Sequence, residues 1–154
     1  MGVVDEGEID RRLQAFTEAC RRAGIKLTHQ RIEVFREVAR TEEHPDVETI
    51  FKRVRFRLPT ISLDTVYRTL KTLEELGVVS RVNYFCEPAR FDANVSAHHH
   101  FVCIKCGLMR DLSIPNAAAL AIPDEARDWG EVKSIHVELR SVCSACAKRH
   151  REKD

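Results

Sequence analysis

The sequence predicts an α+β protein, with a winged helix-turn-helix in the first half and a small α/β domain around four cysteines in the second. Apolar residues recur at three- and four-residue steps through the first half, which is typical of amphipathic helices. Alternating apolar residues and two C-x-x-C pairs in the second half indicate short strands around a cysteine cluster.

Four helices are predicted in the first half, each with its own boundary signals. Gly24 ends the first helix and Thr28 caps the second, while the residues HPD at 44–46 separate the second from the third. Ser62 is a favourable N-cap for the fourth helix, and Gly77 follows its end. The residues predicted to face the core are Ile9, Leu13, Phe16, Cys20, Ala23, Ile32, Phe35, Val38, Ala39, Val47, Ile50, Phe51, Val54, Leu63, Val66, Leu70 and Leu73.

A strand over residues 78–85, with a return over 89–91, would complete a two-stranded wing after the fourth helix. The periodicity is equally compatible with a generic helical domain. Beyond the wing, the sequence predicts strands over 99–103 and 107–112, a helix over 113–126 and a strand over 131–142.

Three segments follow from this pattern. We expect a winged-helix domain over residues 1–86, a hinge over 87–92 that contains Pro88, and a metal-binding domain over 93–154.

Composition limits the functions that the chain can have. The 154 residues are 44% hydrophobic and carry a net charge of only +1, so binding to nucleic acid would need a local basic patch. No apolar run approaches the roughly 20 residues of a membrane span, and the acidic N-terminus does not resemble a signal peptide. We therefore expect a cytoplasmic protein, in which six cysteines favour metal or redox chemistry over structural disulfides.

Two matched C-x-x-C pairs predict a metal site. Four thiolates suit a tetrahedral structural Zn²⁺ and leave no open position for catalysis. Disulfides and a redox-active pair are the alternatives; the cytoplasmic setting argues against disulfides, and the presence of two pairs argues against redox chemistry. Cys20 and Cys86 are expected to be ordinary residues. The predicted ligands are Cys103, Cys106, Cys143 and Cys146.

Three consecutive histidines precede the first cysteine pair and suggest a second metal site. His98 and His100 share one face of an extended segment, and His99 points to the other. A hairpin folded about the cysteine knuckle would place His100 nearly opposite Asp111, and Asp92 lies a few residues upstream. Nitrogen and oxygen ligands together suit Fe²⁺, Mn²⁺ or Zn²⁺. A solvent-exposed histidine run without a metal is the alternative.

Several segments resemble the ferric uptake regulator family of bacterial metal-dependent repressors. The resemblance implies a winged-helix DNA-binding domain, a dimerisation domain with the structural zinc, and a cytoplasmic homodimer that binds a palindromic operator in double-stranded DNA. It implies no enzymatic activity. The most specific segments are ISLDTVYRTLKTLEELGVV at 61–79, RFD at 90–92, HHHFVCIKCG at 98–107 and CSAC at 143–146.

The resemblance also implies a regulatory Fe²⁺ or Mn²⁺ site on five residues around the predicted hinge. Glutamates often occupy the two carboxylate positions in the iron-uptake branch, whereas both are aspartate here, which resembles the peroxide-sensing branch. That branch uses bound Fe²⁺ to react with hydrogen peroxide and oxidise its own histidine ligands, here His44 and His98. Iron sensing, or zinc or manganese sensing, is the alternative. The implied ligands are His44, Asp92, His98, His100 and Asp111.

Some members of the family have a further metal site near the dimerisation domain. Ala97 and Ala118 stand where that site needs ligands, and His136 is one residue out of register against Cys143. Alternation in the predicted strand would turn His136 to the other face. We expect no complete third site, and the sequence assigns no role to His99 or His136.

The fourth helix would be the recognition helix. Hydroxyl groups near its N-terminus suit phosphates, while tyrosine and arginine suit thymine methyls and guanine edges. An ordinary solvated face is the alternative for each residue. The predicted DNA contacts are Ser62, Thr65, Tyr67, Arg68 and Lys71.

Two hypotheses from other classes remain open on the residues alone. A mononuclear non-haem metal enzyme could use two histidines and a carboxylate, although the sequence has no cofactor loop and no separate nucleophile–base pair. A zinc-stabilised interaction module would keep the cysteine cluster without needing the exposed face of the fourth helix.

Overall fold

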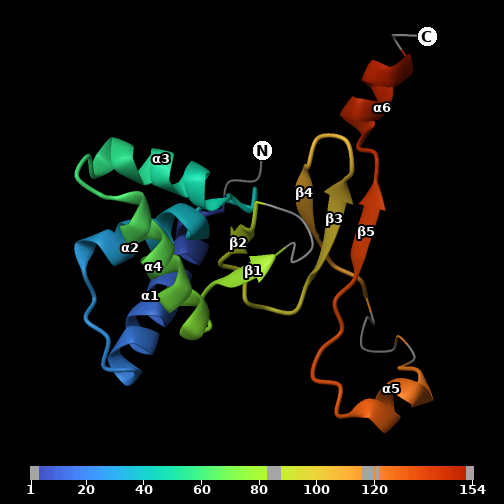
Figure 1. Ribbon diagram of the computed structural model, residues 1–154, viewed down its shortest axis with the longest axis horizontal. Helices are drawn as coiled ribbons and strands as arrows, with labels where there is room; N and C mark the ends of the chain where they lie inside the picture. The colour runs from blue at the N-terminus through green and yellow to red at the C-terminus, as the bar shows by residue number, and fades with distance from the viewer. Residues whose placement is uncertain (1–3, 83–87, 116–119, 121, 152–154) are drawn as a thin grey trace. The chain divides into compact units, whose positions relative to one another are not determined.

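Over the residues that the structure describes, four helices and a two-stranded sheet form the first of two units, and a three-stranded sheet with two short helices forms the second (Figure 1). The structure is a computed structural model that describes residues 4–82, 88–115, 120 and 122–151. The units are Met1–Ser96 and Ala97–Asp154. The predicted hinge at 87–92 stays a prediction. Among the described residues, no helix has both the length and the apolar content needed to cross a membrane.

The helices of the first unit begin at capping side chains, as predicted for the second and fourth. Each N-cap side chain accepts a hydrogen bond from the backbone N–H three residues further on, which satisfies an otherwise orphaned donor. Gly77, with φ of 69°, follows α4 in the left-handed conformation that glycine tolerates best. The helices are α1 (Glu6–Arg22), α2 (His29–Ala39), α3 (Val47–Arg57) and α4 (Leu63–Glu75).

The four apolar helix faces converge on one core. Phe16 of α1 stacks on Phe35 of α2 with ring centroids 4.6 Å apart, and Val66, Leu70 and Leu73 of α4 are buried beside them. The prediction was wrong for Leu63, which is 38% exposed because it opens α4 before the helix reaches the core. It was also wrong for Ala23, which lies beyond the last turn of α1 and is exposed.

Arg57 joins α3 to α2 through two buried carboxylates. Its Nε lies 2.7 Å from Glu33 Oε2, and its guanidinium also donates to Glu37 Oε2 at 2.8 Å. Burial alone would raise the pKa of Glu33, but the hydrogen bond from Arg57 and the charge of Arg36 lower it below the usual value. Buried charges of this kind are tolerated only when paired, so the pairs hold α3 in register with α2.

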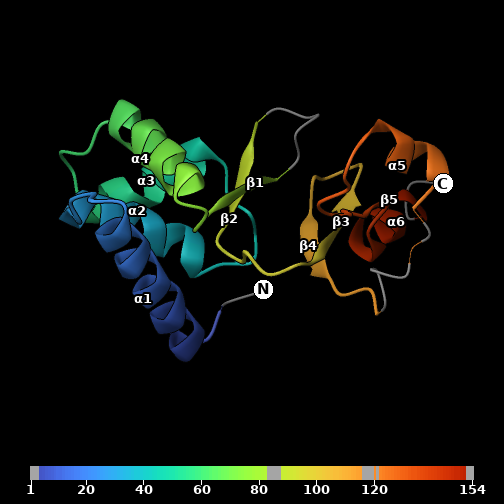
Figure 2. The ribbon, with the colours of Figure 1, turned by 90° about the horizontal axis from the view of Figure 1, so that it is seen from below.

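The wing is shorter than predicted within the described residues. Strand β1 (Ser80–Val82) pairs antiparallel with β2 (Arg90–Asp92), with Ser80 opposite Asp92. Both views place this pair to one side of the four helices (Figures 1 and 2). The predicted strand residues 83–85 and Cys86 lie outside the described residues.

The second unit is organised by the strand that carries the histidines. Strand β3 (His99–Cys103) lies between antiparallel β4 (Met109–Leu112) and parallel β5 (Glu138–Ser141) (Figure 1). The β3–β4 pairing confirms the predicted hairpin. The two helices are α5 (Asp124–Trp129) and α6 (Ser144–Arg151).

Two predicted elements of the second unit were wrong in extent. Residues 113–115, 120, 122 and 123 are not helical, and α5 begins at Asp124. Residues 116–119 and 121 of the predicted helix lie outside the described residues. A proline disfavours helical backbone in the residue before it, so a helix running through 122–123 is not expected. Residues 131–137 are irregular and β5 has four residues, because its partner β3 offers only a short edge for pairing.

Candidate metal centres and DNA-binding face

The four cysteines of the two C-x-x-C pairs meet in the second unit. One pair follows from the turn between β3 and β4, and the other lies where β5 passes into α6. Their sulfurs all lie within 4.8 Å of one another. A tetrahedral ion with bonds of about 2.3 Å needs sulfur–sulfur edges of about 3.8 Å, and Cys106 Sγ lies 3.8 Å from Cys143 Sγ. The donor set therefore fits a closed four-thiolate metal site.

Backbone groups already favour negative charge at one of these sulfurs. The N–H of Cys143 donates to Cys103 Sγ at 3.2 Å, and with the N–H of Cys106 it lowers the pKa of Cys103 to about 6. The neighbouring thiols of Cys106 and Cys143, together with burial, raise the pKa of Cys146 to about 11. Four thiolates so close together repel one another, so full ionisation of the cluster requires a cation.

A histidine and an aspartate form a buried pair in the first unit. His44 Nε2 lies 3.4 Å from Asp92 Oδ2, and their side chains are 1% and 5% exposed. The other carboxylate oxygen, Asp92 Oδ1, accepts a hydrogen bond from the backbone N–H of Asn94 at 2.7 Å. This bond fixes the carboxylate so that Oδ2 faces the imidazole.

Backbone contacts bring the His44 segment to β2. The N–H of Phe91 donates to the carbonyl of Pro45 at 3.1 Å, and Asp46 forms an isolated bridge with Arg90. His44 itself has φ of 52°, an uncommon value for a residue with a side chain. Backbone outliers of this kind cluster at functional sites, where the surrounding structure holds them in place.

The remaining predicted ligands meet in the second unit. His98 Nε2 lies 3.0 Å from His100 Nε2, and each of these nitrogens lies 3.8 Å from Asp111 Oδ1. His100 pairs with Asp111 across β3 and β4, as the sequence predicted. Without a metal, one imidazole can donate to the other. Two nitrogens bound to one ion at about 2.1 Å and at a right angle would also be about 3.0 Å apart, so the donors fit a divalent ion.

Two further histidines lie against this group. His99 is only 6% exposed, and its Nδ1 accepts a hydrogen bond from the N–H of Val137 at 3.2 Å. His136 Nε2 lies 3.1 Å from His100 Nδ1. Alternation did not turn His136 away, because residue 136 lies before β5 and not within it. His136 is exposed, but partial desolvation and the adjacent imidazole of His100 still lower its pKa.

The predicted DNA-contacting residues lie on α4 and at its N-cap. Tyr67 is 54% exposed and lines a shallow groove with Arg68, Lys71 and Arg81. Ser62 Oγ is the helix cap, accepting from the N–H of Thr65 at 3.0 Å. Glu74 and Glu75 line the same groove, and Arg81 pairs with Glu74 at 3.2 Å and Arg68 with Asp64 at 3.8 Å. The exposed face of α4 therefore presents an aromatic ring among side chains of both charges.

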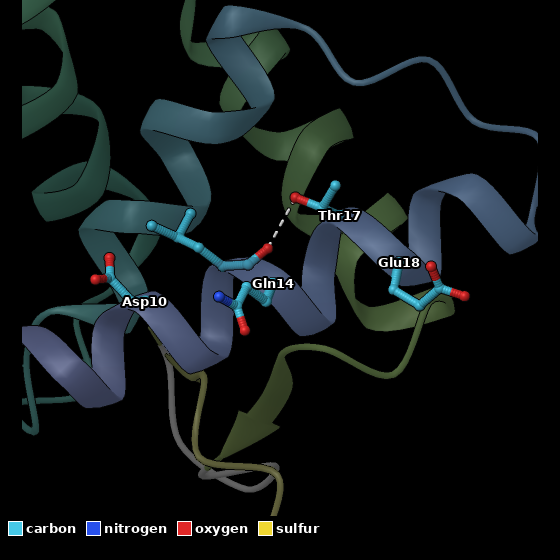
Figure 3. A pocket seen from close by; sticks show the side chains of 5 residues that line it. Asp10, Gln14, Thr17 and Glu18 are labelled. Atoms are coloured by element: carbon cyan, nitrogen blue, oxygen red, sulfur yellow. Dashed lines mark hydrogen bonds between the residues drawn. The ribbon is translucent and has the colours of Figure 1, made fainter.

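A second shallow groove runs along α1 and contains none of the predicted functional residues. The hydroxyl of Thr17 donates to the carbonyl of Leu13 at 2.9 Å, and Glu18 pairs with Arg21 at 2.8 Å. These polar groups are satisfied within the helix itself. The groove is lined by Asp10, Leu13, Gln14, Thr17 and Glu18 (Figure 3).

Comparison with known proteins places these sites in a family context. The sequence model of the ferric uptake regulator family matches residues 22–140. The peroxide-responsive repressor PerR of Staphylococcus epidermidis is 29% identical over 139 residues, which cover 90% of this chain and 92% of that protein.

Solved structures show the same fold. The Helicobacter pylori ferric uptake regulator Fur superposes with a TM-score of 0.75 at 21% identity, over 96% of this chain and 97% of that one. The Campylobacter jejuni peroxide stress regulator superposes with a TM-score of 0.65 at 30% identity, over 87% of this chain and 98% of that one. These likenesses confirm the predicted α+β architecture, a helical N-terminal domain followed by an α/β domain with the four-cysteine cluster.

Proposed function

The chain belongs to the ferric uptake regulator family, and from this membership we propose that it is a repressor whose DNA binding is controlled by one Fe²⁺ or Mn²⁺ ion and ended by hydrogen peroxide. Members of this family are metal-dependent transcription regulators and not enzymes, and they bind operator DNA as dimers.

The regulatory ion would be held by donors from both units. The observation that carries this assignment is that each unit presents a histidine–aspartate group with nitrogen and oxygen atoms facing each other, at 3.4 Å in the first and 3.8 Å in the second. Three neutral imidazoles and two carboxylates would balance the charge of a divalent ion. Mixed nitrogen and oxygen donors suit Fe²⁺, Mn²⁺ or Zn²⁺, whereas the thiolate cluster selects Zn²⁺. The proposed ligands are His44, Asp92, His98, His100 and Asp111.

An ion held in this way would control DNA binding by restricting the two units to one relative orientation. The ion can favour that orientation only through its greater affinity for it. In a two-fold dimer, the orientation sets the spacing between the two recognition helices, and such dimers require half-sites about one helical turn apart or a multiple of it. Metal occupancy would thereby determine affinity for a palindromic operator.

The recognition surface would be the exposed face of α4. Tyr67 can contact thymine methyls and Arg68 a guanine edge or a phosphate, and both are exposed on the groove described above. Lys71 lines the same groove and would add a cation for phosphate contacts. Ser62 and Thr65 would offer hydroxyls near the helix N-terminus, where phosphates are favoured.

Peroxide sensing is supported by the two carboxylate positions. Both are aspartate, Asp92 and Asp111, and relatives named for peroxide response match most of the chain. Bound Fe²⁺ would activate hydrogen peroxide beside its own ligands. One peroxide oxygen would be added to a ring carbon of His44 or His98 and the other would leave as water, with the imidazole giving up the two electrons. The oxidised ring would then be a poorer ligand.

Peroxide treatment of the iron-loaded protein tests this assignment. Full-length protein loaded with Fe²⁺ without air is treated with one equivalent of hydrogen peroxide, and operator binding is followed by fluorescence anisotropy. We expect DNA binding to be lost and the peptide containing His44 or His98 to gain the mass of one oxygen atom. Protein loaded with Mn²⁺ is the matched control. After the same treatment it should still bind DNA, and its peptides should keep their original mass. Unmodified peptides with retained DNA binding would instead favour iron sensing.

A further inference from the structure

His136 contacts the proposed regulatory site from outside its ligand set. Its Nε2 lies 3.1 Å from His100 Nδ1, with the two ring centroids 4.9 Å apart. The residue belongs to the irregular segment that precedes β5. All of these atoms lie within the second unit.

The two ring nitrogens of His100 face different neighbours. Its Nε2 faces His98 Nε2 at 3.0 Å and Asp111 Oδ1 at 3.8 Å, which is the side of the proposed ion. Its Nδ1 faces His136. A histidine that offers the lone pair of Nε2 to a metal carries its proton on Nδ1. His100 would therefore donate that proton in a hydrogen bond, and His136 Nε2 would accept it.

The backbone around His136 is held to β3 on both sides of Val137. The N–H of Val137 donates to the buried ring of His99 at Nδ1, 3.2 Å away. The carbonyl of Val137 accepts from the N–H of His100 at 3.1 Å. These two bonds place His136 beside His100 although the segment is not part of a strand. His99 and His136, to which the sequence assigned no role, are thus both linked to the proposed ligand His100, His136 directly and His99 through the backbone of Val137.

We propose that His136 is a positioning residue for the regulatory metal, which fixes the tautomer and the orientation of His100. This inference rests on the proposed function, since it assumes that His100 binds the ion through Nε2. Ligating histidines generally donate their second N–H to a carboxylate, a carbonyl or a water, and loss of such a partner typically weakens metal binding by about 10- to 100-fold. Here an uncharged imidazole takes that place. His136 itself is not a ligand, because it meets the nitrogen of His100 that points away from the donor group.

Metal titration of substituted proteins tests the inference. The full-length protein, with its cysteine-bound metal retained, is titrated with Mn²⁺, and free Mn²⁺ is measured by electron paramagnetic resonance. We expect His136→Ala to weaken binding about 10- to 100-fold without changing the stoichiometry. His136→Gln should restore most of the affinity, because its amide oxygen can accept the same proton. Lys133→Ala, an exposed change in the same segment, should behave like the wild type.

The outcomes separate this inference from the function on which it rests. Wild-type protein that binds no Mn²⁺ outside the cysteine cluster would contradict both. Normal wild-type binding with unaltered affinity in His136→Ala would overturn the positioning role alone. Failure of His136→Gln to restore affinity, or loss of one equivalent of Mn²⁺ in both variants, would also overturn it. The thermal unfolding curve and cysteine-bound metal content of each variant establish that the second unit is folded.

Discussion

The two candidate metal centres differ in where their donors come from. The cysteine cluster takes all four sulfurs from the second unit, from two C-x-x-C turns attached to one sheet. The proposed regulatory donors are divided, with His44 and Asp92 in the first unit and His98, His100 and Asp111 in the second. A centre whose donors all come from one unit can stabilise that unit. A centre whose donors come from both units can make the arrangement of the DNA-binding domain depend on metal occupancy.

The difference in donors matches this difference in role. Thiolates repel one another strongly without a cation, so four thiolates this close together favour permanent occupancy by a metal. Neutral imidazoles and a few carboxylates can persist without an ion, because imidazoles can hydrogen-bond to one another, as His98 and His100 do. Imidazoles and carboxylates are therefore better suited than thiolates to a site that must lose and regain its metal.

The largest effect is expected from a change in the cysteine cluster. A structural zinc stabilises a small domain by the order of 10 kcal/mol, and Cys106→Ser should lose much of that because one thiolate is missing. We expect the second unit to unfold at lower denaturant concentration and the purified protein to lose zinc. Cys20→Ala, a buried cysteine of the first unit, should leave the zinc content unchanged. Full zinc content in Cys106→Ser would contradict a four-thiolate site.

Removal of Arg57 should destabilise only the first unit. Arg57→Ala removes the closest cation that α3 offers to Glu33 and Glu37. Glu33 keeps Arg36 as a partner, and Glu37 keeps Arg40 and Arg53. Breaking a buried pair costs about 3–5 kcal/mol, and we expect roughly 2–3 kcal/mol because the arginine is partly exposed. Chemical unfolding followed by circular dichroism measures the change, and zinc content should not alter. Arg55→Ala, whose side chain lies over Phe51, is the matched control. An effect no larger than that of Arg55→Ala would show that the carboxylates do not need this partner.

A change on the recognition face should affect DNA binding alone. Tyr67→Ala should weaken operator binding by about 1–3 kcal/mol through loss of base contacts, with Mn²⁺ affinity and zinc content unchanged. Tyr67→Phe keeps the ring and should retain most of the affinity. Anisotropy titrations at fixed salt concentration make the comparison. Wild-type affinity in Tyr67→Ala would remove this residue from the interface.

The smallest effect is expected at the cap of α3, next to the His44 segment. Asp46 accepts from the N–H of Thr49 at 2.7 Å. Burial alone would raise the pKa of Asp46, but hydrogen bonds from the side chain and the N–H of Thr49, with the charge of Arg90, lower it. Asp46→Ala should cost about 1 kcal/mol at neutral pH. A lowered pKa stabilises the fold above the unfolded value of about 3.9, and this stabilisation is lost as the pH falls through the folded pKa. Asp46→Asn keeps the capping hydrogen bond but has no charge, so it should remove only the pH-dependent part of this stabilisation. Equal stability of all three proteins at neutral pH would contradict this role for the cap.

Much of this architecture follows from short-range signals in the sequence. The spacing of Cys103 and Cys106 requires a tight turn, and a hairpin about that turn must place His100 opposite Asp111, as the structure has it. Capping residues such as Thr28 and Ser62 mark helix starts because their side chains satisfy backbone donors locally. These features depend on neighbours within a few residues.

Features that depend on distant contacts were not predictable in the same way. The extent of β5 is set by the length of β3, which lies far away in the sequence. The contact between His136 and His100 joins residues 36 positions apart and depends on backbone bonds at Val137. The pairing of Arg57 with Glu33 and Glu37 likewise gave no sequence signal beyond a cluster of charges. Pro123 was a local signal that should have excluded a continuous helix over 113–126.

Parallel removal of one ligand from each unit tests most directly whether a single ion uses both. Mn²⁺ affinity and metal-dependent operator binding are measured for His44→Ala and His98→Ala, with His29→Ala, an exposed histidine of α2, as control. We predict that both ligand variants lose Mn²⁺ affinity by more than roughly 100-fold, lose operator binding together, and keep their zinc, while His29→Ala is unaffected. Wild-type Mn²⁺ affinity with metal-dependent operator binding in either ligand variant would contradict a shared ion.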